Sequence, residues 1–385
     1  MNPRPNRDLA LVNTAGFLRS LGVGLFGVVL GIYLFRLGLS SFAIGLVIAA
    51  GLAGSASATV VVSFAADRLG RRHSLVFLSL LNAVGGVALA ISPSFPVLLI
   101  MAFIGMVNGT GTDRSASFAL DQAVIPGLVP DVKRTLKLAW YNVLLDGGGS
   151  LGALGAGLPI FLQHRLAIPV YSAYRVLFFG FSGLCMIVAG LYSLLSPAVE
   201  IADASLSGRM SPRISADNKR VLAKITALFS LDAFGGGFLT DALVAYWFFR
   251  RFGVAEHDLG LVFFAVHILN AGSHLGAAWL ARRIGLVNTM VFTHLPSSLF
   301  LMAVPFAPSL KCSFSAPLLV GGGAKVAYDL LLYKSFRRLK PPEEAVAPNT
   351  MTNVAPWNRG PESCGTSSGL RPVESVITCS YRLPS

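Results

Sequence analysis

Long apolar runs constrain the fold of this chain more than any other feature. A helix needs about 20 consecutive, mostly apolar residues to cross the hydrocarbon core of a bilayer, and several runs reach that length. Only 13% of the 385 residues are charged, whereas soluble domains carry about 25%. The mean hydropathy is +0.67. The sequence therefore predicts an all-α membrane protein with many spans.

Nine membrane spans follow from these runs, and a tenth is weaker. The nine are predicted at residues 12–35, 44–65, 75–91, 97–120, 138–162, 176–195, 221–249, 259–281 and 287–307. The tenth, at 314–332, contains Lys325 and Asp329. Past residue 354 the chain has no apolar run, and it is rich in Gly, Pro, Ser, Cys and Arg. We predict a disordered polar tail at 355–385.

A repeat divides the chain in two. Residues 63–72 and 278–287 are similar, and aligning Gly70 with Gly285 gives an offset of 285 − 70 = 215 residues. The same offset aligns Arg36 with Arg251, Gly38 with Gly253, Gly45 with Gly260 and Arg68 with Arg283. We therefore predict a six-helix bundle at 1–196, a polar central linker at 197–220 and a partial second bundle at 221–354.

Basic residues gather in alternate loops, as the positive-inside rule requires of a membrane protein. The more basic side holds the N-terminus, the loop at 68–72, the loop at 133–137 and the central linker. We expect this side to be cytoplasmic, in a multi-pass protein of the plasma membrane. The N-terminus and the central linker, which flank the first bundle, then lie on the same side of the membrane. This requires an even number of spans in the first bundle, and six are predicted.

The same distribution argues against a nucleic-acid partner, although the net charge is +13. The four cysteines have neither metal-ligand spacing nor the pattern of a disulfide framework. A phosphate-binding loop, a zincin motif and a nucleophile elbow are all missing from the sequence. We therefore predict no enzyme activity, no cofactor and no metal site.

Ionisable residues inside predicted spans indicate function or internal pairing, because a charge in the membrane is costly. Counting from the cytoplasmic ends of the spans, Arg19 lies about 10 Å deep, Asp146 about 12 Å and Asp113 about 10–14 Å. We predict that Arg19, Asp113, Arg114 and Asp146 form a substrate or proton site. The alternative is a static salt-bridge network. Asp232 is a weaker candidate for the same site, and the glycines beside it at 235–237 predict a broken or flexible helix, as transporter sites use. For His267 and His274 we expect packing or a hydrogen bond.

The loop Asp67-Arg68-Leu69-Gly70-Arg71-Arg72 between the second and third spans resembles the signature loop of the major facilitator superfamily. The two-fold repeat and the polar linker are similar to that family too. The resemblance implies two six-helix bundles that expose a central site to each side in turn, with spans 1, 4 and 5 lining the cavity of the first half. It also implies that this loop latches the halves in one state, and Asp121 is a candidate partner for Arg71. The alternatives are that Arg71 and Arg72 only set the topology and that Asp121 lies at a solvated helix end.

The function implied is secondary active transport of a small solute, with protons as a candidate coupling ion. Efflux of drugs or metabolites, as by an antiporter, is the direction that the resemblance favours, and we expect a monomer in the bilayer. The alternative from another class is a truncated, non-transporting member acting as a sensor or scaffold, or an inactive product. Its basis is the incomplete second bundle. A channel has less support, because no filter-like segment is found.

Overall fold

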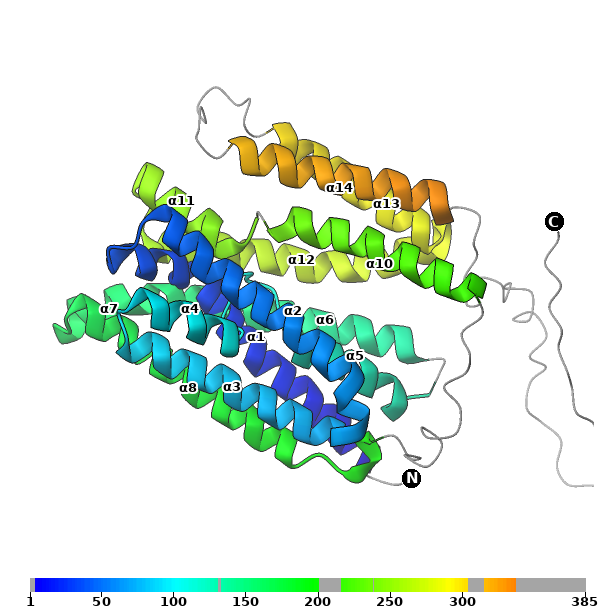
Figure 1. Ribbon diagram of the computed structural model, residues 1–385, viewed down its shortest axis with the longest axis horizontal. Helices are drawn as coiled ribbons and strands as arrows, with labels where there is room; N and C mark the ends of the chain where they lie inside the picture. Colours follow the sequence, from blue (N-terminus) through cyan, green and yellow to red (C-terminus); the bar gives the residue numbers. More distant parts are fainter. Residues whose placement is uncertain (1–3, 131–132, 201–215, 238, 304–314, 337–385) are drawn as a thin grey trace, which may run out of the picture. The chain divides into compact units, whose positions relative to one another are not determined.

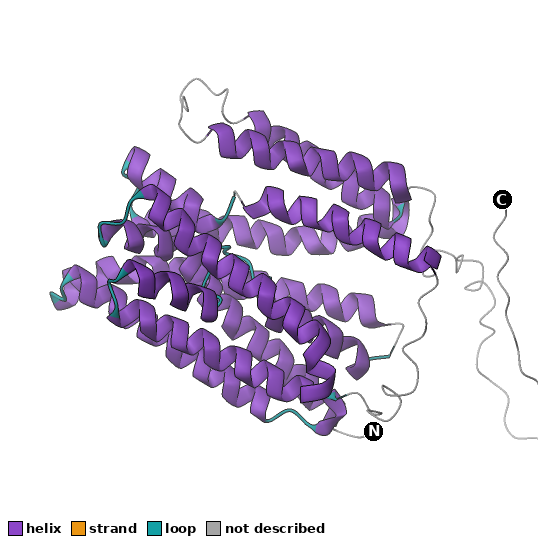
Figure 2. Cartoon of the chain, viewed as in Figure 1, coloured by secondary structure: helices purple, strands orange, loops and turns teal. Residues whose placement is uncertain are grey.

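The computed structural model describes residues 4–130, 133–200, 216–237, 239–303 and 315–336 (Figure 1). All regular structure within these ranges is helical (Figure 2), which confirms the predicted all-α class. The predicted tail at 355–385 and most of the predicted linker at 197–220 lie outside the described residues. The division into a bundle at 1–196 and a partial bundle at 221–354 stays a prediction.

The N-terminal group of helices, α1 to α8, contains both continuous and interrupted spans. The predicted spans at 12–35, 44–65, 75–91 and 176–195 correspond to α1 (Arg4–Arg36), α2 (Ser41–Leu69), α3 (Arg71–Ile91) and α8 (Val170–Ser193). The predicted span at 138–162 consists of α6 (Arg134–Leu154), a 3₁₀ turn η2 (Gly155–Gly157) and α7 (Leu158–Leu166). A second 3₁₀ turn, η3 (Pro197–Val199), follows α8.

The prediction of one continuous helix at 97–120 was wrong. The chain forms α4 (Phe95–Ile104), an irregular stretch at 105–115 and α5 (Ala116–Leu128). This stretch contains three glycines, Gly105, Gly109 and Gly111, and several Asn, Thr and Ser side chains that bond to nearby backbone, and both features disfavour a helix interior. We call residues 105–115 the α4–α5 break.

The C-terminal group consists of α10 (Ala216–Gly237), α11 (Asp241–Phe252), α12 (Glu256–Ile284), α13 (Leu286–Ala303) and α14 (Ser315–Phe336). The weak tenth run is thus a helix, α14. The broken helix predicted beside Asp232 is confirmed, since α10 ends at Gly237 and α11 begins at Asp241. Within the described residues, seven stretches are long and apolar enough to cross a membrane: Asn6–Arg36, Ser41–Leu69, Arg71–Ile91, Leu136–Leu166, Val170–Ser193, Lys219–Phe252 and Glu256–Ala281.

Helix α1 is the most enclosed element of the structure. Every side chain or glycine from residue 26 to residue 34 is buried, and α1 contacts α5, α6, α8, α11 and α12. A helix that is apolar on all sides is stable only when other helices or lipid surround it. Contact with α6 is close, because a Cβ at Gly152 would lie 1.9 Å from the Leu21 carbonyl oxygen; small residues permit this approach in membrane helices.

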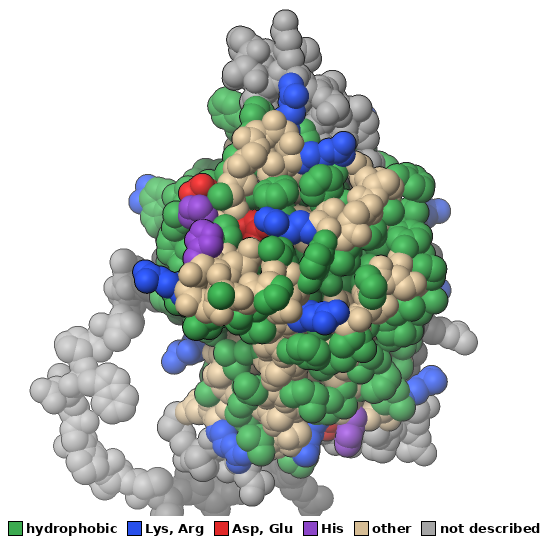
Figure 3. Space-filling model, turned by 90° about the vertical axis from the view of Figure 1, so that its left-hand side faces the viewer, with side chains coloured by type: hydrophobic (Ala, Val, Ile, Leu, Met, Phe, Trp, Pro, Cys, Tyr) green, Lys and Arg blue, Asp and Glu red, His purple; other side chains and the backbone are tan. Residues whose placement is uncertain are grey.

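The outward faces of α2 and α3 carry exposed apolar side chains, including Val60, Phe64, Phe77 and Val84. In a water-soluble protein so much exposed apolar surface would cause association. Lipid contact explains it, as the composition predicts. Figure 3 views the structure from the left-hand end of Figure 1, where helices end, and there Lys, Arg and His lie among hydrophobic side chains.

Candidate transport site

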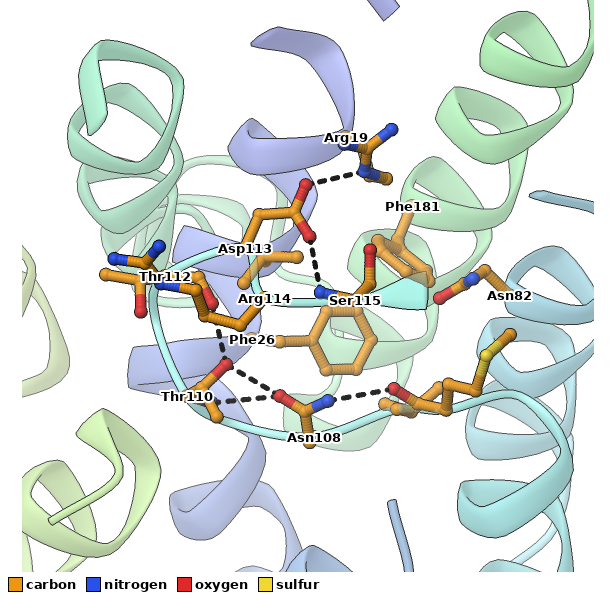
Figure 4. A pocket seen from close by; sticks show the side chains of 13 residues that line it. Arg19, Phe26, Asn82, Asn108, Thr110, Thr112, Asp113, Arg114, Ser115 and Phe181 are labelled. Carbon is orange, nitrogen blue, oxygen red and sulfur yellow. Dashed lines mark hydrogen bonds and ion pairs between the residues drawn. The ribbon is translucent and has the colours of Figure 1, made fainter. Parts of the chain in front are cut away.

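Side chains of the α4–α5 break form hydrogen bonds with backbone groups of the same stretch. The Asn108 amide nitrogen donates to the Met106 carbonyl at 3.1 Å, and its oxygen accepts from the Thr110 hydroxyl at 2.7 Å. The Asp113 carboxylate accepts from the Ser115 amide at 3.1 Å (Figure 4). Non-helical backbone at membrane depth occurs only where protein buries it or where it lines a cavity. A cavity does lie here, lined by α1, α3, α8 and the break: Arg19, Val23, Phe26, Asn82, Met106, Val107, Asn108, Thr110, Thr112, Asp113, Arg114, Ser115 and Phe181.

Arg19 binds two carboxylates beside this cavity, and it lies about 22 Å along α1 from Arg4. Its Nε donates to Asp113 Oδ2 at 2.5 Å, and its Nη2 donates to Asp121 Oδ2 at 2.9 Å. Two tyrosines complete the shell. Nη2 and Nη1 contact the Tyr141 and Tyr192 hydroxyl oxygens, and both hydroxyls donate to Asp121, at 2.6 and 2.9 Å. We call these five residues the Arg19 network.

The structure divides the predicted four-residue cluster. It brings Arg19 and Asp113 together, but the Arg114 side chain points away from Asp113, although both residues line the same cavity (Figure 4). Arg114 is exposed, and its guanidinium lies 5.3 Å from the centre of the Phe118 ring. The break is the reason, because consecutive residues of non-helical chain can face opposite directions. The depths estimated from the sequence placed these residues at one level in the membrane, but they could not predict the directions in which the side chains point.

Asp146 bonds to the C-terminal group of helices. Its Oδ2 accepts from the Asn270 amide at 2.9 Å and lies 2.8 Å from His274 Nε2, both on α12. His267, two turns earlier on α12, lies 3.1 Å from Asp241 Oδ2. His274 thus makes one of the hydrogen bonds that the sequence allowed, whereas His267 is buried beside Asp241 and its Nε2 has no hydrogen-bond partner among the described residues. The predicted placement of Asp146 with Arg19 is replaced by a contact between α6 and α12.

The two helix breaks touch each other. The Ala242 amide, at the start of α11, donates to the Gly109 carbonyl at 2.9 Å. Gly111 has φ +73°, and a Cβ there would lie 1.7 Å from Asp241 Oδ2. Only glycine fits both the left-handed backbone and this approach. Sequence reasoning noted the glycines at 235–237 but missed the contact between the two breaks.

Known proteins agree with this architecture. The sequence model of the Major Facilitator Superfamily matches residues 12–353. The chain belongs to the major facilitator superfamily. An uncharacterized membrane protein of Saccharomyces cerevisiae, YJR124C, is 26% identical over 333 residues, covering 78% of this chain and 74% of the relative.

Solved structures of major facilitator transporters share the fold. A bacterial homolog of the human lysosomal transporter Spinster has a TM-score of 0.58 at 15% identity, covering 89% of this chain and 77% of that chain. The xylose transporter XylE from E. coli has a TM-score of 0.55 at 16% identity, covering 85% and 87%. At these identities the likeness concerns the fold alone.

The family's signature loop is fastened to the N-terminal group in this major facilitator protein. Gly70 has φ +90° in the turn between α2 and α3. The Arg71 and Arg72 amides donate to the Glu200 carboxylate at 2.7 and 3.1 Å, which caps the start of α3. Glu200 was missed, because nothing in its sequence surroundings links it to a helix 129 residues earlier.

The side chains of the loop make local contacts. Arg71 Nε lies 3.2 Å from Asp67 Oδ1, and Arg72 Nη1 donates to the Leu195 carbonyl at 3.3 Å; Arg68 is exposed. The predicted pairing of Arg71 with Asp121 was wrong, because Asp121 is fully buried against Arg19.

Two further ion pairs involve the C-terminal group. Lys325 on α14 binds Asp232 on α10 at 2.9 Å, with both side chains 27% exposed. Arg36, at the end of α1, binds Glu256, at the start of α12, at 2.8 Å, and the Tyr174 hydroxyl donates to the same carboxylate. Arg36 and Glu256 were not predicted as partners, since their contact joins residues 220 apart.

Proposed function

We propose that this protein is a secondary active transporter that moves a small solute by alternating access. Membership of the major facilitator superfamily supports transport in general. The observation that carries the specific proposal is the α4–α5 break, where irregular backbone, a charged network and a cavity meet halfway along α1. Discontinuous helices mark substrate and ion sites in secondary transporters.

We also propose that transport is coupled to protons through Asp113 and Asp146. Each carboxylate is buried and bonded to a basic side chain: Asp113 to Arg19, and Asp146 to His274. A carboxylate that exchanges partners during a conformational change can also exchange a proton. Asp232, paired with Lys325, is a third candidate. Efflux, a plasma-membrane location with a cytoplasmic N-terminus and a monomeric state remain proposals that rest on the family resemblance and the loop charges.

Flux measurements in proteoliposomes test this function. Counterflow of a labelled solute, with saturation by unlabelled solute, is expected for a transporter. No flux of any solute would favour the non-transporting alternative, and conductance without saturation would favour a channel. For proton coupling, the Asp113→Asn and Asp146→Asn variants should each lose the pH dependence of uptake. If both keep the wild-type rate and pH profile, proton coupling through these residues is wrong.

A further inference from the structure

We propose that the solute is a small anion, such as a carboxylate, that binds Arg114 and travels together with one proton on the Arg19 network. This inference rests on the proposed transport function and names the substrate class of the same site. It depends on three observations. Arg114 is exposed, Arg19 already contacts two carboxylates and two tyrosines, and the charges of the two arginines balance those of Asp113 and Asp121.

Arg114 is the arginine of the site that is open to a ligand. It belongs to the α4–α5 break, its side chain is exposed, and it forms no ion pair within the described part of the chain. Its contact is with the Phe118 ring, which stacks on Tyr141. A guanidinium at membrane depth without a carboxylate partner needs water or a ligand. A carboxylate is the planar anion that guanidinium binds best, through two parallel hydrogen bonds.

Arg19, in contrast, cannot take a substrate anion without losing a partner. Its three nitrogens already contact two carboxylates and two phenol oxygens, and it is 7% exposed. The titratable groups that face it are Asp113, Asp121, Tyr141, Tyr192 and the Cys185 thiol beside the adjoining cavity. The Arg19 network is therefore suited to bind the proton, and Arg114 is suited to bind the anion.

The charge balance couples the two events. Arg19 and Arg114 carry two positive charges, and Asp113 and Asp121 carry two negative charges, so the empty site is neutral. A bound anion would leave one uncompensated negative charge in a low-dielectric region, which is costly. One proton on either carboxylate restores neutrality. Asp121 Oδ1 is buried with no hydrogen-bond partner within the described residues, so it can accept a proton without breaking a bond.

Proton uptake on anion binding tests this inference without requiring flux. Pyruvate, acetate and xylose are added separately to the detergent-purified full chain in weakly buffered solution near neutral pH containing a pH indicator. We expect binding of pyruvate or acetate, followed by intrinsic tryptophan fluorescence, to take up about one proton per bound anion, and xylose to take up none. Anion binding without proton uptake would overturn the coupling. Saturable binding of xylose together with no binding of either anion would overturn the substrate class and leave the transport function intact.

Two variants assign the roles. Arg114→Gln should bind the anion about 10- to 100-fold more weakly, the range for a lost charge-assisted hydrogen bond. Arg165→Gln, an exposed arginine at the end of α7, is the matched control and should bind as the wild type. Asp121→Asn should still bind the anion but take up no proton, because the variant site carries one net positive charge that the anion alone neutralises. Unchanged anion affinity in Arg114→Gln would contradict the proposal. So would unchanged proton uptake in both single variants, Asp121→Asn and Asp113→Asn.

Discussion

The contacts within the N-terminal group of helices differ in kind from those that join it to the C-terminal group. Arg19 connects residues of α1, the α4–α5 break, α5, α6 and α8, and its guanidinium is buried with four partners. The polar contacts between the groups are separate small clusters: Asp146 with His274, Gly109 with Ala242, and Arg36 with Glu256. The Arg19 contacts stabilise the N-terminal group as one unit, whereas the polar contacts between the groups can break one at a time when the groups move apart.

Replacing Arg19 should have the largest effect, because it breaks contacts inside the unit. Arg19→Met leaves two buried carboxylates without their counter-charge, and loss of one partner from a buried ion pair costs about 3–5 kcal/mol. We expect little monodisperse protein after detergent extraction and a strongly lowered thermal midpoint. Arg165→Met is the control and should extract normally. A stable, well-extracted Arg19→Met protein would contradict the structural part of this comparison.

Gly111→Ala should act next, at the contact between the two breaks. The added Cβ would lie 1.7 Å from Asp241 Oδ2, and the residue has φ +73°, a conformation that costs an L-residue about 1–2 kcal/mol. We expect counterflow to fall by at least about tenfold, because the contact cannot form, while extraction remains possible. Gly190→Ala is the control, since nothing lies within 4 Å of its Cβ position. Equal counterflow in both variants would show that the breaks need not touch.

The bond between Asp146 and His274 should contribute less. A double-mutant cycle with Asp146→Asn and His274→Asn should give a coupling free energy of about 0.5–1.5 kcal/mol in unfolding experiments. His257 is exposed at the start of α12, so a cycle of Asp146→Asn with His257→Asn should be additive. If the two cycles give the same coupling, the contact between α6 and α12 carries no specific energy.

Glu200→Gln should have the smallest effect. The carboxylate accepts two amides at the start of α3, and a capping interaction is worth about 1 kcal/mol. The amide oxygen of glutamine can keep one of these bonds, so we expect the thermal midpoint to fall by only a few degrees. Asp67→Asn removes an exposed pair worth about 0.3–0.5 kcal/mol and should change the midpoint less. A larger loss in Asp67→Asn would reverse this order.

Sequence reasoning found the residues of the site better than their partners. Arg19, Asp113, Arg114 and Asp146 were selected because charges are rare in spans, and Arg19 and Asp113 do bond. Asp121 was assigned to the signature loop, because its position near a span end says nothing about the inward direction of its side chain. Glu256 and Glu200 were missed, because each lies at a helix end where a charge is ordinary. Pairing across 129 or 220 residues has no local sequence signal.

The amino-acid sequence by itself determined the helical class, most of the helix positions, the membrane environment and the family resemblance. Each follows from local composition or from the spacing of residues within one segment, because burial in lipid demands apolar helices of a set length. Tertiary structure decided where the span at 97–120 is interrupted, in which directions the Asp113 and Arg114 side chains point, and which helices meet at Asp146 and Gly109. The reason is physical: a side chain's partner depends on how helices rotate and pack, and hydropathy contains no information on rotation about a helix axis.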